Sequence, residues 1–330
     1  LQILKLLKKL QKKLNMAILF ISHDLGVVKN LADYVYIMKD GNIIEHNSNF
    51  KIFNYPKEKY TKELIDTKNL VRKKIIDKNK LLLKIDDLKV WYPIKKGLLK
   101  RTVNYVKAIN SISFKLYENQ TIGIVGESGS GKSSLAMAIL KLIPSSGNIF
   151  YKNNNISLIK PKQFLNFRRE IQIIFQDPYA ALSPRMTVRD IIAEPLEVLG
   201  LTKSRTETDQ QVREIAGKCR INLEHLRRYP HAFSGGQRQR ISIARALAAR
   251  PKFVVADECV AALDVSIQAD ILNLLKQLQS DLDLTFLFIS HDLSVVAHVC
   301  DYVAVMYLGE IVEEGPVREI FANPKHEYTQ

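Results

Sequence analysis

The chain has 330 residues, of which 46% are hydrophobic, and a formal net charge of +15 at pH 7. No apolar run approaches the ~20 residues of a membrane-spanning helix, and the Lys-rich start has no signal-peptide cleavage site, so we expect a cytosolic protein that reaches a membrane only through a partner. The lysines are scattered among Asn and Ile, which favours a solvated surface over nucleic-acid binding. Three cysteines without paired spacing indicate reduced thiols: Cys219, Cys259 and Cys300.

The beginning of the chain repeats its end. Residues 19–28 read LFISHDLGVV and residues 287–296 read LFISHDLSVV, an offset of 268 (287 minus 19) that continues without a gap to the last residue. Such a repeat predicts a duplicated domain. Residues 1–65 would be the last helix, strand and tail of a first copy, and the polar residues 66–80 a linker. We therefore expect a fragment of a longer protein with two tandem copies.

A phosphate-binding loop follows a buried strand. Residues 121–134 read TIGIVGESGSGKSS, which matches the G-x-x-x-x-G-K-[ST] motif between a predicted strand and a predicted helix. Backbone N–H groups at such a helix start attract phosphate oxygens, Lys132 would reach the β- and γ-phosphates, and Ser133 would ligate Mg²⁺. The predicted nucleotide-binding residues of this loop are Gly126, Glu127, Ser128, Gly129, Ser130, Gly131, Lys132, Ser133 and Ser134.

A second predicted anion site precedes the helix that starts near residue 235. Residues 233–237 read FSGGQ, and the nucleotide-binding residues expected here are Ser234, Gly235, Gly236 and Gln237. Because the hydroxyl and the glycine N–H groups lie at a helix start, they favour an anion.

An apolar strand then ends in two carboxylates. Residues 253–258 read FVVADE, and in P-loop ATPases the Asp of such a strand holds Mg²⁺. This assigns the metal to Asp257 and the role of general base, which polarises the attacking water, to Glu258.

These motifs, in this order, resemble those of ATP-binding cassette (ABC) proteins. The resemblance implies that Gln176 touches Mg²⁺ or water, that His291 contacts the γ-phosphate, and that Asp264 belongs to the loop facing a second cassette. Tyr92 would stack on adenine, although an aromatic that merely ends a strand is an equally good interpretation. Cys259 departs from the family, which usually has Pro after the catalytic Glu.

The fold implied for residues 81–330 is α/β, a P-loop ABC cassette. It would contain a mixed core sheet with flanking helices, an antiparallel β subdomain, and a helical subdomain over about 177–235. In the first copy His23 corresponds to His291, but no phosphate loop precedes it, so residues 1–65 should bind no nucleotide unaided.

Two segments, DPYAALSPRMTVRDIIAEPL and EEGPVREIFANPKHEYTQ, resemble the oligopeptide, dipeptide, nickel and glutathione branch of bacterial importers. A tandem chain with two cassettes resembles the ATP-binding proteins of glutathione importers and of microcin C/oligopeptide importers, which implies a role in peptide uptake. The resemblance implies an ATPase that uses ATP and Mg²⁺ on the inner face of the membrane. Its partners would be transmembrane permease subunits, a second cassette (the first copy or another chain) and, indirectly, a solute-binding protein.

Two other functions remain open from the residues alone. A cassette ATPase of DNA repair or translation would use the positive charge, and a truncated product could hydrolyse nothing.

Overall fold

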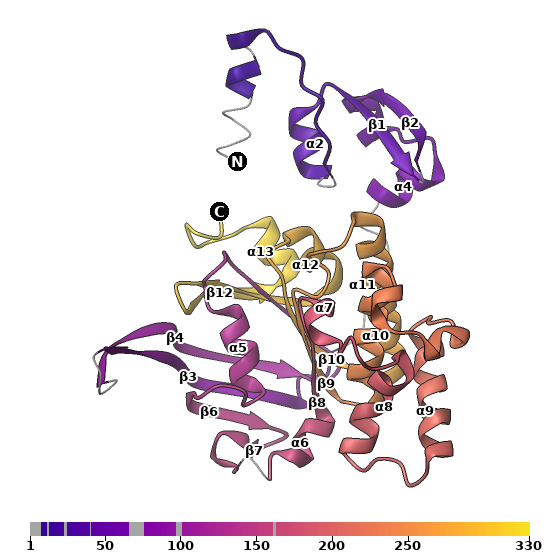
Figure 1. Cartoon of the computed structure of the whole chain (residues 1–330). Coiled ribbons are helices and arrows are strands. Elements are labelled where there is room, and N and C mark those ends of the chain that lie inside the picture. Colours follow the sequence, from indigo (N-terminus) through magenta and orange to yellow (C-terminus); the bar gives the residue numbers. More distant parts are fainter. Residues whose placement is uncertain are drawn as a thin grey trace. The chain divides into compact units, whose positions relative to one another are not determined.

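The computed structural model describes residues 8–11, 13–22, 25–39, 41–65, 76–96, 101–160 and 163–330. The chain forms two units, the first within residues 1–72 and the second from residues 73–263 and 267–330, and each is described by itself (Figure 1). None of the helices in the described part of the chain combines the length and the hydropathy that crossing a bilayer requires.

The first unit is a small hairpin with helices. Its elements are α2 (Leu25–Leu31), β1 (Tyr34–Lys39), β2 (Asn42–Ser48), α3 (Asn49–Asn54) and α4 (Lys59–Ile65). The two strands are antiparallel, and they pack against α3 through the buried residues Val35, Ile37 and Ile52.

The repeat in the sequence is also a repeat in backbone geometry. Strands β11 (Tyr302–Tyr307) and β12 (Glu310–Pro316) form the same hairpin in the second unit. Both hairpins carry a register shift at the same place, between Ile37 and Met38 in one and between Val305 and Met306 in the other. The core residues correspond as well, because Val303, Val305 and Ile320 are the buried residues here.

The strand expected before this hairpin in the first copy is absent from the described residues. Residues 17–21 match the strand β10 (Thr285–Ile289) of the second unit, but they are irregular. In the second unit β10 pairs in parallel with two neighbours, β5 (Thr121–Val125) and β9 (Phe253–Asp257). A parallel strand depends on such distant partners, and residues 8–65 supply none where they are described. The prediction of a strand here was wrong.

The second unit is built on one ten-stranded sheet in the order β7-β6-β3-β4-β12-β11-β5-β10-β9-β8. Strands β11, β5, β10, β9 and β8 are parallel, and β3, β4, β6 and β7 form an antiparallel part. The strands not yet given are β3 (Leu81–Lys96), β4 (Arg101–Tyr117), β6 (Ser146–Tyr151), β7 (Asn154–Asn155) and β8 (Ile171–Ile174). This is the expected mixed sheet with an antiparallel β subdomain.

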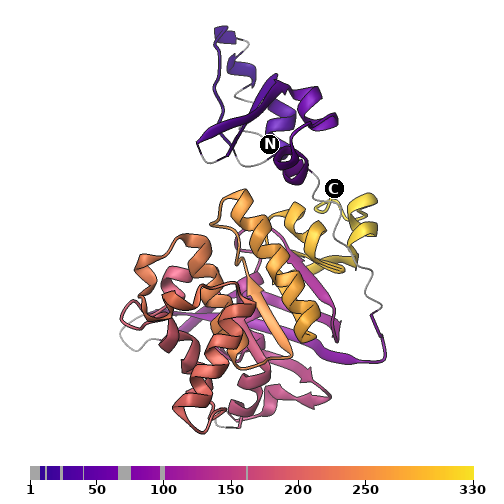
Figure 2. The same ribbon diagram turned by 90° about the vertical axis from the view of Figure 1, so that its right-hand side faces the viewer.

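Helices cover this sheet, and Figures 1 and 2 show α8 to α11 gathered on one side of the parallel strands. The helices are α5 (Lys132–Ile139), α6 (Leu165–Glu170), α7 (Pro178–Ala181), α8 (Val188–Val198), α9 (Arg205–Lys218), α10 (Gly235–Ala248), α11 (Val265–Leu282), α12 (Leu293–Val299) and α13 (Val317–Ala322). Short 3₁₀ turns add η1 (Ile156–Leu158), η2 (Leu223–Arg227) and η3 (Pro230–Ala232).

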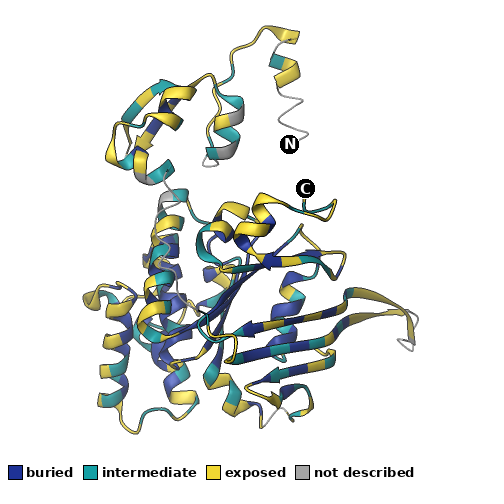
Figure 3. Ribbon diagram, turned by 180° about the vertical axis from the view of Figure 1, so that it is seen from behind, coloured by how far each residue is buried: buried dark blue, intermediate teal, exposed yellow. Residues whose placement is uncertain are grey.

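The apolar core surrounds the central parallel strands of the sheet. Every residue of β5, β9 and β10 is buried, and Figure 3 shows the buried residues concentrated in these strands while the far end of the β3–β4 hairpin is exposed. Continuous apolar runs of this kind are typical of parallel strands covered on both faces. Helix α5 contacts β9 as well as β3 and β4, so the helix after the phosphate loop joins the two parts of the sheet.

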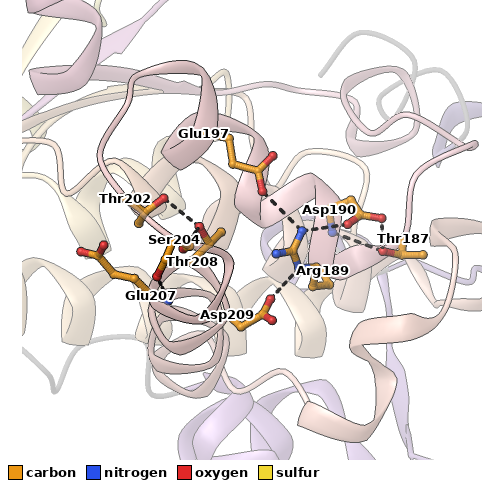
Figure 4. A network of polar contacts seen from close by, with 9 residues as sticks. All are labelled: Thr187, Arg189, Asp190, Glu197, Thr202, Ser204, Glu207, Thr208 and Asp209. Carbon is orange, nitrogen blue, oxygen red and sulfur yellow. Dashed lines mark hydrogen bonds and ion pairs between the residues drawn. The ribbon is translucent and has the colours of Figure 1, made fainter.

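Residues 177–235 fold as helices and 3₁₀ turns, and a guanidinium group ties α8 to α9 (Figure 4). Arg189 Nε donates to Asp209 Oδ1 at 2.7 Å, and its Nη1 donates to Asp190 at 3.1 Å and to Glu197 at 3.4 Å. Thr187 caps α8 by accepting a hydrogen bond from the N–H of Asp190. The network holds the two helices in a fixed arrangement at the surface.

Candidate functional site

The phosphate loop connects β5 to α5 through three glycines with positive φ. Gly126, Gly129 and Gly131 have φ of 153°, 86° and 103°, values that residues with a side chain rarely adopt. A Cβ on Gly131 would also lie 2.2 Å from the carbonyl oxygen of Ala108. Conformation therefore favours glycine at all three positions, and space requires it at Gly126 and Gly131, whereas nothing lies within 4 Å of a Cβ built on Gly129.

Lys132 lies buried against the loop that it follows. Its Nζ donates to the carbonyl oxygens of Gly126 at 2.8 Å and of Glu127 at 2.7 Å. Burial lowers the pKa of Lys132, and the carboxylates of Glu258 and Asp257 oppose that shift. A lysine ammonium has three N–H donors, so one remains for a phosphate oxygen.

Ser133 and Asp257 lie together, as a shared metal ligand set requires. Ser133 Oγ donates to Asp257 Oδ1 at 3.3 Å. Asp257 is the last residue of β9, and burial raises its pKa while the Ser133 hydroxyl acts against that shift. The described residues contain no group of three or more His, Cys, Asp and Glu that could hold a metal alone. Mg²⁺ suits such a place, since it takes one or two carboxylates plus substrate phosphates.

Glu258 joins the two remaining predicted catalytic residues. Its Oε2 accepts a hydrogen bond from Gln176 Nε2 at 2.9 Å, and its Oε1 lies 3.3 Å from His291 Nδ1. The backbone of Glu258 has a φ of 44° and donates its N–H to Ile289 at the end of β10. Strained conformations of this kind persist where the surroundings enforce them. The two strand ends thus aim one carboxylate at two polar side chains.

Tyr92 lies beside the start of α5, the helix that follows the phosphate loop. It comes from β3, is 40% exposed, and its hydroxyl is 3.3 Å from Ser134 Oγ. The ring is thus beside the phosphate loop and accessible. Its stacking on adenine stays a prediction.

The other predicted binding residues are placed separately. Ser234 caps α10, and Ser234 and Gln237 exchange the reciprocal hydrogen bonds of a capping box. No hydrogen bond between described residues joins this helix start to the phosphate loop. Asp264 is exposed, as are Glu127, Ser128 and Gly129, whereas Ser130 is buried and its hydroxyl has no partner among the described residues.

Cys259, the departure from the usual motif, is buried in the apolar core beside the catalytic pair. Burial raises the pKa of its thiol to about 12, so the side chain is a small apolar filler at neutral pH. All three cysteines are free. His23, the counterpart of His291, lies outside the described residues.

One residue near the loop was not predicted from the sequence. The hydroxyl of Tyr328 accepts a hydrogen bond from the N–H of Glu127 at 2.9 Å. The two are 201 residues apart, and the only signal in the sequence is that Tyr328 repeats Tyr60.

Comparisons with known proteins show what this chain is similar to. Residues 109–261 match the family model described as ABC transporter. The glutathione import ATP-binding protein GsiA of Escherichia coli (strain K12) is 43% identical over 357 residues, which cover 100% of this chain and 57% of that protein. The peptidoglycan transport ATP-binding protein YejF of Agrobacterium fabrum is 44% identical over 330 residues, covering 100% of this chain and 60% of that protein. The chain thus spans less than two thirds of the curated relatives it matches.

Two solved structures share the fold. The dimeric structure of the ATP-binding cassette MJ0796 in a post-hydrolysis state, bound to ADP and Pi, has a TM-score of 0.64 and 26% identity, covering 72% of this chain and 99% of that chain. The cbiO1 protein of Clostridium perfringens, part of the transporter complex cbiONQ, has a TM-score of 0.63 and 26% identity over 74% of this chain and 92% of that chain.

Proposed function

We propose that the second unit of this chain is an ATP-binding cassette of the ABC transporter family, and that the chain hydrolyses ATP to drive a bacterial importer of peptides. The observation that carries the proposal is the convergence on one site of Lys132 and Ser133, from the start of α5, with Asp257 and Glu258, from the end of β9. Relatives named for import of glutathione and transport of peptidoglycan support the peptide class of cargo.

The proposed chemistry assigns each side chain a task. Lys132 binds the β- and γ-phosphates, and the loop N–H groups with the start of α5 bind the remaining phosphate oxygens. Glu258 accepts a proton from the attacking water, which His291 and Gln176 orient through the contacts they already make with that carboxylate. A base that is positioned in this way contributes about 10²–10⁴ in rate.

Ser133 and Asp257, together with Gln176, would hold Mg²⁺ beside the phosphates. When bound there, the metal would supply charge neutralisation for the phosphate oxygens. Among the described residues the buried carboxylate of Asp257 has one hydrogen-bond partner, Ser133, and burial raises its pKa, so a cation beside it would relieve the cost of keeping it ionised.

The proposed assembly uses two cassettes. Ser234 to Gln237 make no hydrogen bond to the phosphate loop among the described residues, and together with Asp264 they would complete the site of a second cassette. The dimeric MJ0796 cassette supports this arrangement. The permease subunits are expected to contact the helical residues 177–235 on the inner face of the membrane.

ATP hydrolysis by the purified chain, compared between Glu258→Gln and Glu224→Gln, tests the chemistry. Glu224 is an exposed residue of η2, so its variant controls for the loss of one carboxylate. We expect Glu258→Gln to keep ATP binding and to lose at least about 100-fold of the hydrolysis rate. Unchanged hydrolysis would refute the assignment of the base.

Import is tested with the transmembrane permease subunits of a bacterial peptide importer. We expect the chain to co-purify with them and the Glu258→Gln variant to stop uptake of labelled peptide or glutathione. Salt-sensitive RNA binding without any permease in the complex would favour a nucleic-acid role instead.

A further inference from the structure

The last residues of the chain return to the phosphate loop. After α13, the segment 323–330 brings Tyr328 beside the loop, and the Tyr328 hydroxyl accepts the hydrogen bond from the N–H of Glu127 at 2.9 Å. This contact lies at the first peptide group of the loop, directly after β5.

That peptide group is held at both ends. Its carbonyl oxygen, on Gly126, accepts from Lys132 Nζ at 2.8 Å, and its N–H, on Glu127, donates to Tyr328. Gly126 has a φ of 153° and no Cβ to restrict rotation about its backbone bonds. Hydrogen bonds at its two ends hold the plane of this peptide group, and that plane sets where the Gly126 carbonyl oxygen meets the Lys132 ammonium, for which the Glu127 carbonyl oxygen is a second acceptor at 2.7 Å.

Tyr328 is itself fixed by the tail that carries it. Glu313 of β12 accepts hydrogen bonds from the N–H groups of Lys325 at 2.8 Å and His326 at 3.1 Å. The N–H of Tyr328 donates to His326 Nδ1 at 3.1 Å, and its ring centroid lies 4.2 Å from that of Tyr307. The hydrogen-bonded turn at residues 325–328 therefore holds the Tyr328 hydroxyl beside the phosphate loop.

We propose that Tyr328 is a positioning residue for Lys132, acting through the peptide group between Gly126 and Glu127. The proposal deepens the proposed function and rests on it. The Tyr328 hydroxyl holds the N–H end of that peptide group. The carbonyl end therefore stays in place, and it keeps the ammonium of Lys132 at the position where a phosphate must bind. Tyr328 touches no phosphate and accepts no proton.

The first copy provides a matched control within the same chain. Glu45 accepts hydrogen bonds from the N–H groups of Lys57 and Glu58, both at 3.0 Å, so the tail turn is the same. The residue equivalent to Tyr328 is Tyr60, whose ring lies under the ammonium of Lys39 at 4.7 Å. No phosphate loop occurs among the described residues of this unit, so the Tyr60 hydroxyl has no such peptide group to hold.

The experiment compares Tyr328→Phe with Tyr60→Phe and Tyr307→Phe in the full chain, each variant losing only a hydroxyl. We expect Tyr328→Phe to raise the Kd for ATP and the KM about three- to tenfold, the range for one hydrogen bond. We expect kcat to change by less than about twofold, since Glu258 is untouched. Hydrogen exchange of the Glu127 N–H should accelerate in this variant alone.

The two control variants should bind ATP like the wild type, and all three should keep their Tm within about 2 °C. A Tyr328→Phe variant that binds ATP as tightly as the wild type, with an unchanged Glu127 exchange rate, would overturn the proposal while leaving the ATPase assignment intact. A wild-type chain that binds no ATP would instead overturn the proposed function itself.

Discussion

The two copies of the hairpin and tail have related sequences and the same local fold, yet they differ in what surrounds them. Leu19 and Ile21 are 89% and 90% exposed, whereas their counterparts Leu287 and Ile289 are fully buried. Met38 is 61% exposed and Met306 is buried. The same letters are thus core in one unit and surface in the other.

The difference separates local from distant causes of structure. The hairpin, its register shift and the tail turn capped by a glutamate recur in both copies, because their hydrogen bonds join residues close in the chain. The parallel strand forms only in the second unit, where strands distant in sequence lie on both sides of it. Pairs of variants at equivalent positions can test this separation.

The largest difference, in the rate of ATP hydrolysis, is expected between variants of His291 and of its counterpart His23. His291→Ala should lower ATP hydrolysis by about 100-fold or more, because the contact with Glu258 that orients the water is lost. His23→Ala should leave hydrolysis by this 330-residue chain unchanged, since residues 1–65 contain no phosphate loop. Steady-state phosphate release measures both, and equal losses would contradict the comparison.

The next difference concerns the core. Leu287→Ala should reduce the free energy of unfolding of the second unit by about 2–5 kcal/mol, because it opens a cavity among buried residues. Leu19→Ala removes the same atoms from an exposed position and should change stability by less than about 0.5 kcal/mol. Native-state hydrogen exchange, read separately for each unit, distinguishes the two, and a large effect at Leu19 would mean that this position is covered in solution.

A smaller difference is expected at the hairpin turns. Gly309 and Gly41 have φ of 83° and 78°, but only at Gly309 would a Cβ meet another atom, the carbonyl oxygen of Ala108 at 2.9 Å. Gly41→Ala should therefore cost about 1 kcal/mol of strain, and Gly309→Ala about 2–3 kcal/mol. Urea unfolding of each variant gives both values, and the comparison fails if Gly41→Ala is the more harmful.

The smallest effect concerns the carboxyl groups of Glu45 and Glu313, whose contributions to stability should depend on pH in the same way. The hydrogen bond from the Lys325 N–H, with that from His326, holds the pKa of Glu313 below its ordinary value of 4.5. For Glu45, burial acts in the opposite direction, but hydrogen bonds from Thr61, Lys57 and Glu58 lower the pKa below 4.5. A lowered pKa means that each carboxylate stabilises its tail above pH 4.5 and loses that effect as the pH falls through the folded pKa.

Carboxyl NMR titration measures these values. Glu314, the neighbour of Glu313, serves as the internal control because burial raises its pKa. Glu45 and Glu313 should both titrate below 4.5 and Glu314 above it. Tails that titrate differently from one another would show that the two turns are not equivalent.

The sequence predicted the residues whose role depends on a short motif. The phosphate-loop glycines, Lys132 with its neighbour Ser133, and the carboxylates at the end of β9 were all placed in advance, because strand, loop and helix follow one another within a few residues. The mixed sheet was predicted through resemblance, which carries information about distant pairings that one chain alone lacks.

What could not be predicted is where distant segments meet. Nothing in the letters indicates that Tyr328 reaches the N–H of Glu127, or that Glu258 bonds to Gln176 and His291 at once. The expected strand at residues 17–21 was wrong for the same reason, since its identity as a strand depends on neighbours and not on its own apolar residues. Asp264 and the residues at the start of α10 stay predictions, because their role needs a second cassette.

The β3–β4 hairpin carries the chain's single tryptophan, Trp91, at 41% exposure and directly before Tyr92. The ammonium of Lys107 lies 4.7 Å from its ring. An indole at a polar, half-open position changes its emission when the water around it changes. The protein therefore contains an intrinsic fluorophore one residue from the predicted adenine contact, and nucleotide titrations can be followed optically on the unlabelled chain.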